Sequence, residues 1–385
     1  MFYYLKLLYL IFYNSVKIPI THFLFKNKLI TEEKYNKKIK DIIIYNGPVF
    51  IKYVQLILID KEHLKKYLSI DLIKELTDLE DKIYTNIKFR DNVVINNTIH
   101  LENYSSTAAG SICAIYEFSN NNEVFIIKKI HKNIEETISI GYIVLQLVVY
   151  ILKKLSLNYK SILSIIDMKT FKSSTLQQCS MIYESKNLQQ FYNLYNHYKI
   201  INIPSYIYNN NEIIIMKKLN GYKFNDFIDK FPDYKEESYY VLISSIYLMI
   251  SKKLLHGDFH LGNMLFSIEN NKVVINIYDF GIIFNLNDIQ SDSLLNYIET
   301  LENNHLTTFL KTFNKNITED LINNRHKLFL RRESHNKLNV SYLSSLKIPL
   351  EIINILSILC YIETLLINLD INYLFNFMIE NDILE

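Results

Sequence analysis

The chain has 385 residues, of which 49% are hydrophobic and 21% are charged, and its formal net charge is +2. This length and composition predict a folded protein with a substantial core and exclude a disordered one. Because the lysines are spread along the chain and the net charge is near zero, no nucleic-acid partner is expected.

The three cysteines, Cys113, Cys179 and Cys360, lie far apart and show no Cys-x-x-Cys or Cys/His spacing. Such an arrangement favours free thiols over a disulfide or a zinc site. It predicts an intracellular, reducing compartment.

Residues 1–18, MFYYLKLLYLIFYNSVKI, form an apolar and aromatic stretch that Lys6 interrupts. Its apolar core is shorter than the roughly 20 residues of a spanning helix, and no small-residue cleavage site follows it. Two alternatives stay open: an interfacial helix that makes a peripheral membrane or lipid contact, and a buried packing helix. The apolar runs at 138–152 and 352–369 contain Gln146 and Glu363, and we predict core helices for both.

The apolar spacing predicts three successive regions. Residues 1–92 have helical periodicity and form an N-terminal helical extension that contains the sequence KYVQ. Residues 93–220 contain short β-forming runs around Asn-rich turns, interrupted by helical stretches near 137–155 and 175–198, and form a small β-rich N-lobe. Residues 221–385 form a helical C-lobe. The predicted fold class is α+β and bilobal, with the small β-rich lobe followed by the helical lobe.

The C-lobe contains the two segments HGDFHLGNMLF (256–266) and VINIYDFG (274–281). If the strand and the loop are hydrogen-bonded neighbours, the side chains of Asp258, Asn263 and Asp279 converge. Mg²⁺ prefers a few such oxygens and completes its octahedron with phosphates and water, so Asn263 and Asp279 are the predicted metal ligands. Asp258 is the predicted catalytic group, which orients or deprotonates an attacking hydroxyl, as in phosphoryl transfer by protein kinases.

These two segments have two other interpretations, a turn at the end of a strand and a zinc site. The Asp-Phe-Gly sequence alone is also typical of a turn at the end of a strand. His256 and His260 have the spacing of two zinc ligands, but no Glu lies between them as in HExxH, and Gly257 disfavours a regular helix. We expect both histidines to support the loop rather than bind metal.

An ATP site also needs a cation and backbone amides near the phosphates. The run EVFIIKKI (123–130) places Lys128 or Lys129 in a strand, whose alternation sends one of them inward; a solvated lysine pair is the alternative. Upstream, SSTAAGSI lacks GxGxxG, yet its small residues let backbone amides approach phosphates. The predicted ATP-binding loop consists of Thr107, Ala108, Ala109, Gly110 and Ser111.

These segments resemble the UbiB family of atypical protein-kinase-like proteins, which are tied to ubiquinone and other isoprenoid lipids. The resemblance covers roughly residues 40–300 and includes NGPVFIKYVQLI, which is similar to the Lys-x-Gly-Gln helix of that family through Lys52 and Gln55. It implies that Lys128 is the ATP lysine and that ATP and Mg²⁺ are the cofactors. Glu184 in YESKN is the candidate partner of Lys128, and a solvated helix face is its alternative.

The chain also departs from that family. Val54 replaces the Lys-x-Gly-Gln glycine, and the Glu-x-Asp motif reads Gln178, Cys179 and Ser180. The resemblance implies N-terminal helices that lie over the active site and exclude large proteins, and the changed residues leave that restraint open. After DFG the chain continues directly into a helical pattern, so an extended protein segment is not the expected substrate.

The predicted function is therefore an atypical UbiB-type kinase or ATPase that binds Mg-ATP, with a link to isoprenoid-lipid metabolism implied by the resemblance. Two alternatives stay open. One is a catalytically weak, pseudokinase-like scaffold that binds nucleotide, and the other is a small-molecule phosphotransferase, which the segment around Lys52 disfavours. The phosphoryl acceptor and the oligomeric state are not predicted.

Overall fold

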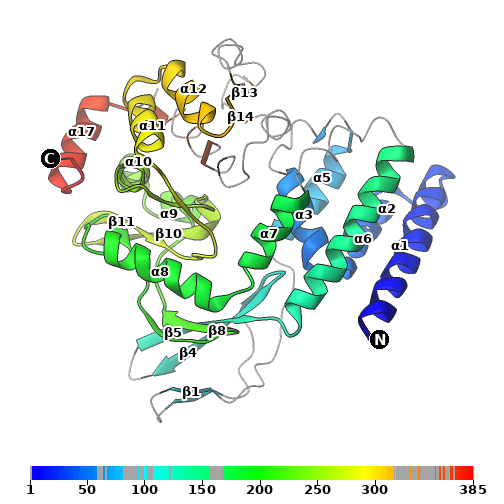
Figure 1. Cartoon of the computed structure of the whole chain (residues 1–385). Helices are drawn as coiled ribbons and strands as arrows, with labels where there is room; N and C mark the ends of the chain where they lie inside the picture. The colour runs from blue at the N-terminus through cyan, green and yellow to red at the C-terminus, as the bar shows by residue number, and fades with distance from the viewer. Residues whose placement is uncertain are drawn as a thin grey trace. The chain divides into compact units, whose positions relative to one another are not determined.

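The computed structural model describes residues 2–58, 64–65, 67–80, 93–95, 99–101, 107–120, 123–155, 168–315 and 369–384, together with 317, 329–330, 337–338, 352, 355–356, 359 and 365–366 (Figure 1). The chain forms two compact units: unit 1 is Met1–Phe118 with Ile126–Cys179, and unit 2 is Ser119–Phe125 with Ser180–Glu385. The predicted boundaries at 92 and 220 stay predictions, and residue 92 lies outside the described residues.

Helices dominate unit 1, as predicted for the N-terminal extension. They are α1 (Phe2–Lys26), α2 (Glu32–Asn46), α3 (Pro48–Leu58), α5 (Ile70–Thr77), the 3-10 helix η1 (Asp78–Glu80), α6 (Ile134–Leu155) and α7 (Met168–Gln177). The local sequence sets several of their ends. Thr31 caps α2 by accepting the N–H of Lys34. Gly47 ends α2 at φ 84°, a conformation that glycine adopts easily, and Pro48 begins α3.

Gly141 lies inside α6, where glycine lowers helix stability. Helices α3 and α6 pack against each other, and a Cβ at Gly141 would lie 3.1 Å from Cγ2 of Val49. The missing side chain therefore lets the two helices approach closely.

Short antiparallel strand pairs form the β-rich region. Strand β3 (Ala108–Ala109) in unit 1 pairs antiparallel with the part of β4 (Cys113–Asn120) that belongs to the same unit, and β5 (Glu123–Ile130) follows in the chain. In unit 2, β7 (Tyr206–Asn209) pairs antiparallel with β8 (Ile213–Lys217). The predicted β-forming runs thus form strands, including the pair β1 (Val93–Ile95) and β2 (Ile99–Leu101).

Unit 2 contains the remaining elements. They are α8 (Met181–Tyr195), β6 (Ile201–Asn202), α9 (Phe224–Lys230), η3 (Pro232–Tyr234), α10 (Lys235–Ser251), β9 (Leu254–His256), η4 (Leu261–Asn263), β10 (Met264–Glu269), β11 (Lys272–Ile277), β12 (Ile283–Asn285), α11 (Asp288–Thr300), α12 (Asn303–Lys311), β13 (Phe329–Leu330), β14 (Lys337–Leu338) and α17 (Ile371–Glu380). Helix α10 is buried from Tyr240 to Ile250 and packs against β9, β11, α11 and α17. It is the core helix of this unit.

Two of the three cysteines lie within the described residues, and neither of these two forms a disulfide. Cys179 is buried, and its Sγ lies 3.4 Å from the carbonyl oxygen of Thr175, to which it donates. Burial raises the pKa of this thiol to about 12, so at pH 8 it remains protonated and unreactive.

We therefore expect iodoacetamide at pH 8 to modify the partly exposed Cys113 in the native protein and Cys179 only after denaturation. Mass spectrometry of tryptic peptides measures both rates in one sample, and labelling in urea serves as the control. Native-state labelling of Cys179 at the rate of Cys113 would contradict the buried position.

Candidate functional site

Two antiparallel strand pairs in unit 2 build the site. Strand β10 pairs with β11 so that Met264 lies opposite Ile277, and the N–H of Tyr278 donates to the carbonyl of Asn263 (3.2 Å). Strand β9 pairs with β12, and the N–H of Gly257 donates to Ile282 (2.9 Å). The loop and the strand of the sequence motif are therefore hydrogen-bonded neighbours, which is the condition under which the predicted site residues converge.

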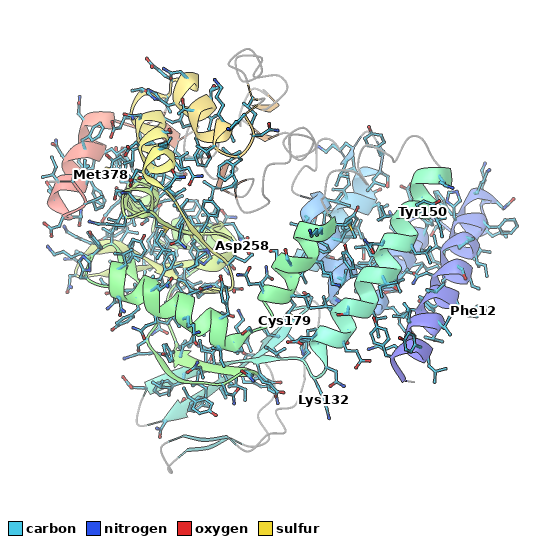
Figure 2. All side chains as sticks on the ribbon, in the orientation of Figure 1. Phe12, Lys132, Tyr150, Cys179, Asp258 and Met378 are labelled. Atoms are coloured by element: carbon cyan, nitrogen blue, oxygen red, sulfur yellow. The ribbon has the colours of Figure 1, made fainter. Side chains whose placement is uncertain are left out.

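Asp258, labelled in Figure 2, has a half-exposed side chain whose position two neighbours fix. Nδ2 of Asn263 donates to the backbone carbonyl of Asp258 (3.0 Å) and to its Oδ2 (3.2 Å), and Nε2 of His260 lies 3.6 Å from the same oxygen. Because the amide nitrogen of Asn263 contacts Asp258, its Oδ1 is the atom that could bind a cation. The predicted role of Asp258 as the catalytic group and that of Asn263 as a metal ligand are thus compatible within one loop.

Asp279 has a φ of 66°, in the left-handed region that few non-glycine residues adopt. Its Oδ1 accepts the N–H of Gly281 at 3.4 Å. Backbone conformations of this kind cost on the order of 1–3 kcal/mol and cluster at functional sites. The strained backbone at Asp279 therefore supports its assignment as a site residue.

His256 is buried among the rings of Phe191, Phe259 and Phe280, whose centroids lie 5.3–6.0 Å from its own. Its Nδ1 accepts the N–H of Asp258 at 3.3 Å. Burial lowers the pKa of His256, although the charges of nearby carboxylates oppose this shift. The ring therefore remains neutral at pH 7 and fixes the loop on which Asp258 lies.

The second histidine of the loop, His260, contacts the side chain of Asp258. Its Nδ1 accepts the N–H of Gly262 at 3.0 Å, which leaves the proton on Nε2, the atom that faces Asp258. Burial lowers the pKa of His260, but the hydrogen bond and charge of Asp258 and the charge of Asp279 outweigh it, and the pKa is raised. Both carboxylates thus lie close to one imidazole.

The zinc alternative finds no support within the described ranges. They contain no group of three or more His, Cys, Asp or Glu side chains that could hold a metal ion. One ring nitrogen of each histidine instead accepts a backbone N–H of the loop. Both histidines therefore contact the backbone of the loop, and their predicted role in supporting it stays a prediction.

Gly262 provides a test of this arrangement, because a Cβ at this position would lie 2.6 Å from Cε1 and 2.7 Å from Nδ1 of His260. Replacement by Ala must displace the ring from Asp258. For the predicted role of Asp258 in phosphoryl transfer, a displacement of about 1 Å can lower the rate about 10²-fold, so phosphate release from Mg-ATP by Gly262→Ala is the measurement, and only a small change in melting temperature is expected. Asp226→Ala, which changes an exposed side chain on α9 outside this loop, is the control. Equal activity of the two variants would contradict a positioning role for His260.

Three residues that the sequence motifs do not include also hold the site. Nζ of Lys223 donates to the carbonyl of Gly262 and to the hydroxyl of Tyr278, which contacts the same carbonyl. Nδ2 of Asn187 donates to the carbonyl of Phe280 in the DFG sequence (2.8 Å). Asn187 follows Glu184 by three residues on α8, a spacing that places both on one helix face and could have indicated it.

The predicted phosphate-binding residues lie in unit 1. Lys128 is 8% exposed, whereas Lys129 is partly exposed, as strand alternation predicts for one inward lysine. The loop 107–111 comprises β3 and a tight turn, in which the N–H of Gly110 donates to Cys113 (2.9 Å). A ring nitrogen of His131 lies 2.9 Å from the carbonyl oxygen of Gly110. This turn is therefore fixed within its own unit.

The N-terminal motif residues Lys52 and Gln55 lie on α3 in unit 1. Nε2 of Gln55 donates to the carbonyl of Leu79 at 2.7 Å, so this amide links α3 to η1. Ser180, at a changed family position, caps α8 by accepting the N–H of Tyr183. Glu184 is 3% exposed in the first turn of that helix. Its ion pair with Lys128 would join the two units and stays a prediction.

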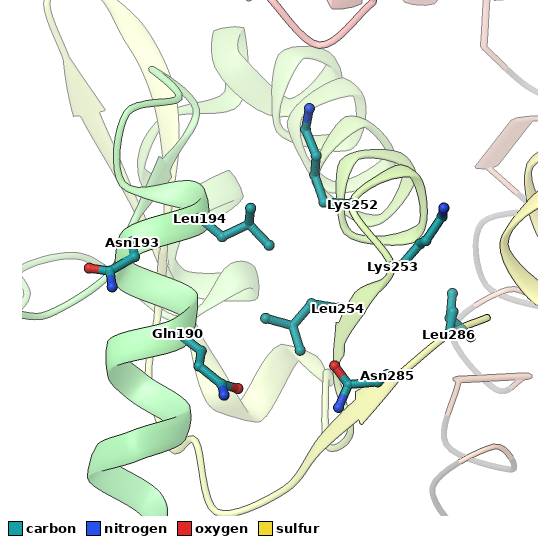
Figure 3. A pocket seen from close by; sticks show the side chains of 8 residues that line it. All are labelled: Gln190, Asn193, Leu194, Lys252, Lys253, Leu254, Asn285 and Leu286. Carbon is teal, nitrogen blue, oxygen red and sulfur yellow. The ribbon is translucent and has the colours of Figure 1, made fainter. Parts of the chain in front are cut away.

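A pocket of about 530 Å³ lies elsewhere in unit 2 (Figure 3). It is lined by Gln190, Asn193 and Leu194 of α8 and by Lys252, Lys253, Leu254, Asn285 and Leu286. None of the predicted catalytic or metal-binding residues lines it. This pocket is therefore not the site that the motif forms.

An α+β fold that carries Asp258, Asn263 and Asp279 in this arrangement defines a protein-kinase-like protein. The chain belongs to the family described as the ABC1 atypical kinase-like domain, which matches residues 97–312, more than half of the chain. This is the UbiB family that the motifs resemble. The predicted family and the kinase-like α+β fold class are confirmed.

Two solved structures are similar to this chain at low sequence identity. The complex of Rv3197 with erythromycin from Mycobacterium tuberculosis is 15% identical, with a TM-score of 0.40, and the match covers 67% of this chain and 72% of that one. The kinase domain of PF14_0431 is 13% identical, with a TM-score of 0.29, and the match covers 53% and 56% of the two chains. A search of the curated proteins found no match.

Proposed function

We propose that the protein is an atypical kinase or ATPase that binds Mg-ATP and transfers a phosphoryl group to a small acceptor or to water. The observation that supports this proposal most directly is the position of Asp258, held by Asn263 and His260 through the same carboxylate oxygen. If these segments only formed a turn at the end of a strand, Asn263 and His260 would not need to contact the same carboxylate oxygen of Asp258.

The residues fit a magnesium ion. Oδ1 of Asn263 and the carboxylate of Asp279 are hard oxygen donors, and Mg²⁺ is usually bound through one or two protein carboxylates, substrate phosphates and water. When bound, Mg-ATP supplies the phosphoryl group and an ion that neutralises its charge. The backbone strain at Asp279 is consistent with a ligand whose direction the turn determines.

Asp258 is the proposed orienting group or base. Its side chain is 39% exposed, so an acceptor hydroxyl can reach it, while Asn263 and His260 restrict its rotation. Nδ1 of the neutral His256 accepts the backbone N–H of Asp258 and so restrains the loop. These contacts preorganise the carboxylate and lower the entropic barrier to reaction.

The segment after Asp279 favours a small acceptor. Strand β12 ends at Asn285, and α11 begins at Asp288 behind a capping box formed by Asn287 and Gln290. No long segment that could hold an extended peptide lies between Asp279 and this helix. The link to isoprenoid lipids rests on the family membership and is part of the proposal.

Phosphate release from Mg-ATP by the wild-type protein and by Asp279→Asn tests the proposal. Asn adopts left-handed conformations readily, so we expect a folded variant that has lost the charged ligand. Turnover should fall at least about 10²-fold, as when one preorganised electrostatic contact is removed. Asp288→Asn, which removes an exposed partner of Lys253 outside the site, is the control.

Measurements of nucleotide binding distinguish the proposed enzyme from a scaffold that binds nucleotide without turning it over. Titration calorimetry with ATP, with and without Mg²⁺, should show that magnesium strengthens binding to the wild-type protein and not to Asp279→Asn. Background-level release by both proteins together with intact binding would overturn the enzyme proposal and identify a nucleotide-binding scaffold.

A further inference from the structure

The outer face of α1 is unusually apolar for a surface helix. Large side chains that are about half exposed or more lie along it at Tyr4, Leu5, Leu8, Phe12, Ile20 and Phe23, which are mostly three, four or eight residues apart. This spacing places them on one side of the helix. Exposed apolar surface of this extent marks a binding site for a partner or for a membrane.

The opposite face of α1 is partly polar. Asn14 and Thr21 are buried there, and the amide of Asn14 exchanges two hydrogen bonds with the amide of Asn46 on α2 (2.6 and 2.9 Å). A surface helix in water normally has the reverse distribution. The distribution on α1 therefore suits an outer environment that is more apolar than water.

Helix α6 extends this surface. It packs against α1, and Nζ of Lys6 on α1 donates to Thr137 at the start of α6. One face of α6 is buried, as predicted for a core helix, but Ile143, Leu147 and Tyr150 are exposed at successive turns of the other. Figure 2 labels Phe12 on α1 and Tyr150 on α6. We call these two outer faces the α1–α6 face.

The net charge of the N-terminal residues indicates which kind of binding partner suits the α1–α6 face. Residues 1–46 contain eight lysines and three acidic residues, a net charge of +5 in a chain whose total is +2. Helix α1 itself has Lys6, Lys17 and Lys26 and no Asp or Glu. An anionic lipid surface complements this charge, and aromatic side chains favour the headgroup zone. A second copy of the chain would instead bring like charges together.

We propose that the α1–α6 face rests on the surface of a lipid bilayer that contains anionic headgroups. Both helices are long and apolar enough to cross a membrane by length and composition. A helix that lies on the surface retains the Asn14–Asn46 amide pair and the packing of α1 on α2, whereas a spanning helix would lose both. This proposal does not depend on the catalytic one.

The absence of tryptophan from the chain permits a direct test. Phe12→Trp and Tyr150→Trp each place one fluorophore on the α1–α6 face, and Ile289→Trp places one at a similarly exposed position on α11 in unit 2. Vesicles of phosphatidylcholine with phosphatidylserine should shift the emission of the first two to the blue, and brominated lipids should quench it. Ile289→Trp should show neither effect.

Charged substitutions then measure the contribution of each helix. Phe12→Glu and Tyr150→Glu should each weaken vesicle binding about tenfold or more, because each replaces an aromatic ring that contacts lipid by a charged group. Ile289→Glu should leave vesicle binding unchanged. Salt should weaken binding, and vesicles without phosphatidylserine should bind less. Circular dichroism verifies that the exposed substitutions leave the helices intact.

Several outcomes would overturn the proposal. They are wild-type protein that does not bind these vesicles, binding that Tyr150→Glu leaves unchanged, and equal binding to vesicles with and without phosphatidylserine. A dimer that Phe12→Glu dissociates, in the absence of vesicle binding, would assign the face to a second copy of the chain.

Discussion

Asp258→Asn is expected to lower the rate of phosphate release from Mg-ATP by about 10²- to 10⁴-fold and to leave ATP affinity nearly unchanged. This range is the usual contribution of a positioned general base. The amide retains the shape of the carboxylate and can still accept from Nδ2 of Asn263, so the loop should keep its structure. What disappears is the charge that attracts a proton from the acceptor.

The measurement is steady-state phosphate release together with calorimetric ATP titration. Asp258→Glu, which keeps a carboxylate but displaces it, should have intermediate activity. Asp226→Asn changes an exposed aspartate on α9 and should have full activity. Unchanged turnover in Asp258→Asn would remove Asp258 from the mechanism, and a parallel loss of ATP affinity would assign it to nucleotide binding instead.

The second large effect concerns Lys128 and Glu184, which are 8% and 3% exposed in their respective units. The sequence predicts that they form an ion pair. If they do, Lys128→Met and Glu184→Gln should each lower the free energy of unfolding by about 3–5 kcal/mol, because each leaves the other charge buried without its partner. Urea unfolding followed by circular dichroism measures these changes.

A double-mutant cycle tests the pair itself. Combining both substitutions should cause less destabilisation than the sum of the two single effects, with a coupling of about 2 kcal/mol. The exposed pair of Lys217 and Glu123, whose charged atoms lie 2.7 Å apart, is the matched control and should couple by less than about 1 kcal/mol. Additive effects of Lys128→Met and Glu184→Gln would show that these residues act independently.

Much of the fold could be predicted because its signals are local. The β-forming runs around Asn-rich turns became β4, β5, β7 and β8, and the apolar periodicity before residue 80 became helices. The proximity of the three motif residues could be predicted for the same reason. Asp258 and Asn263 are close in sequence, and a single antiparallel strand pair places Asp279 beside them.

What the supporting residues contact could not be predicted, because these contacts join distant parts of the chain. Asn187 lies 93 residues before the DFG carbonyl that it contacts, and Lys223 lies 39 residues before Gly262. Gly141 has no turn or motif that would explain it. Its role depends on how closely Val49 of another helix approaches.

The sequence by itself determined the kinase-like class of this protein, because an aspartate, an asparagine and a second aspartate behind a strand specify one chemistry at short range. It did not decide whether residues 1–18 pack inside the protein or face an apolar medium, since an apolar helix is compatible with both. The tertiary structure decided that α1 has a packed face and an exposed face: one buries the amide pair of Asn14 and Asn46, and the other leaves Phe12 and its neighbours exposed. The direction in which a side chain points depends on which helices pack around it, and only the folded chain contains that information.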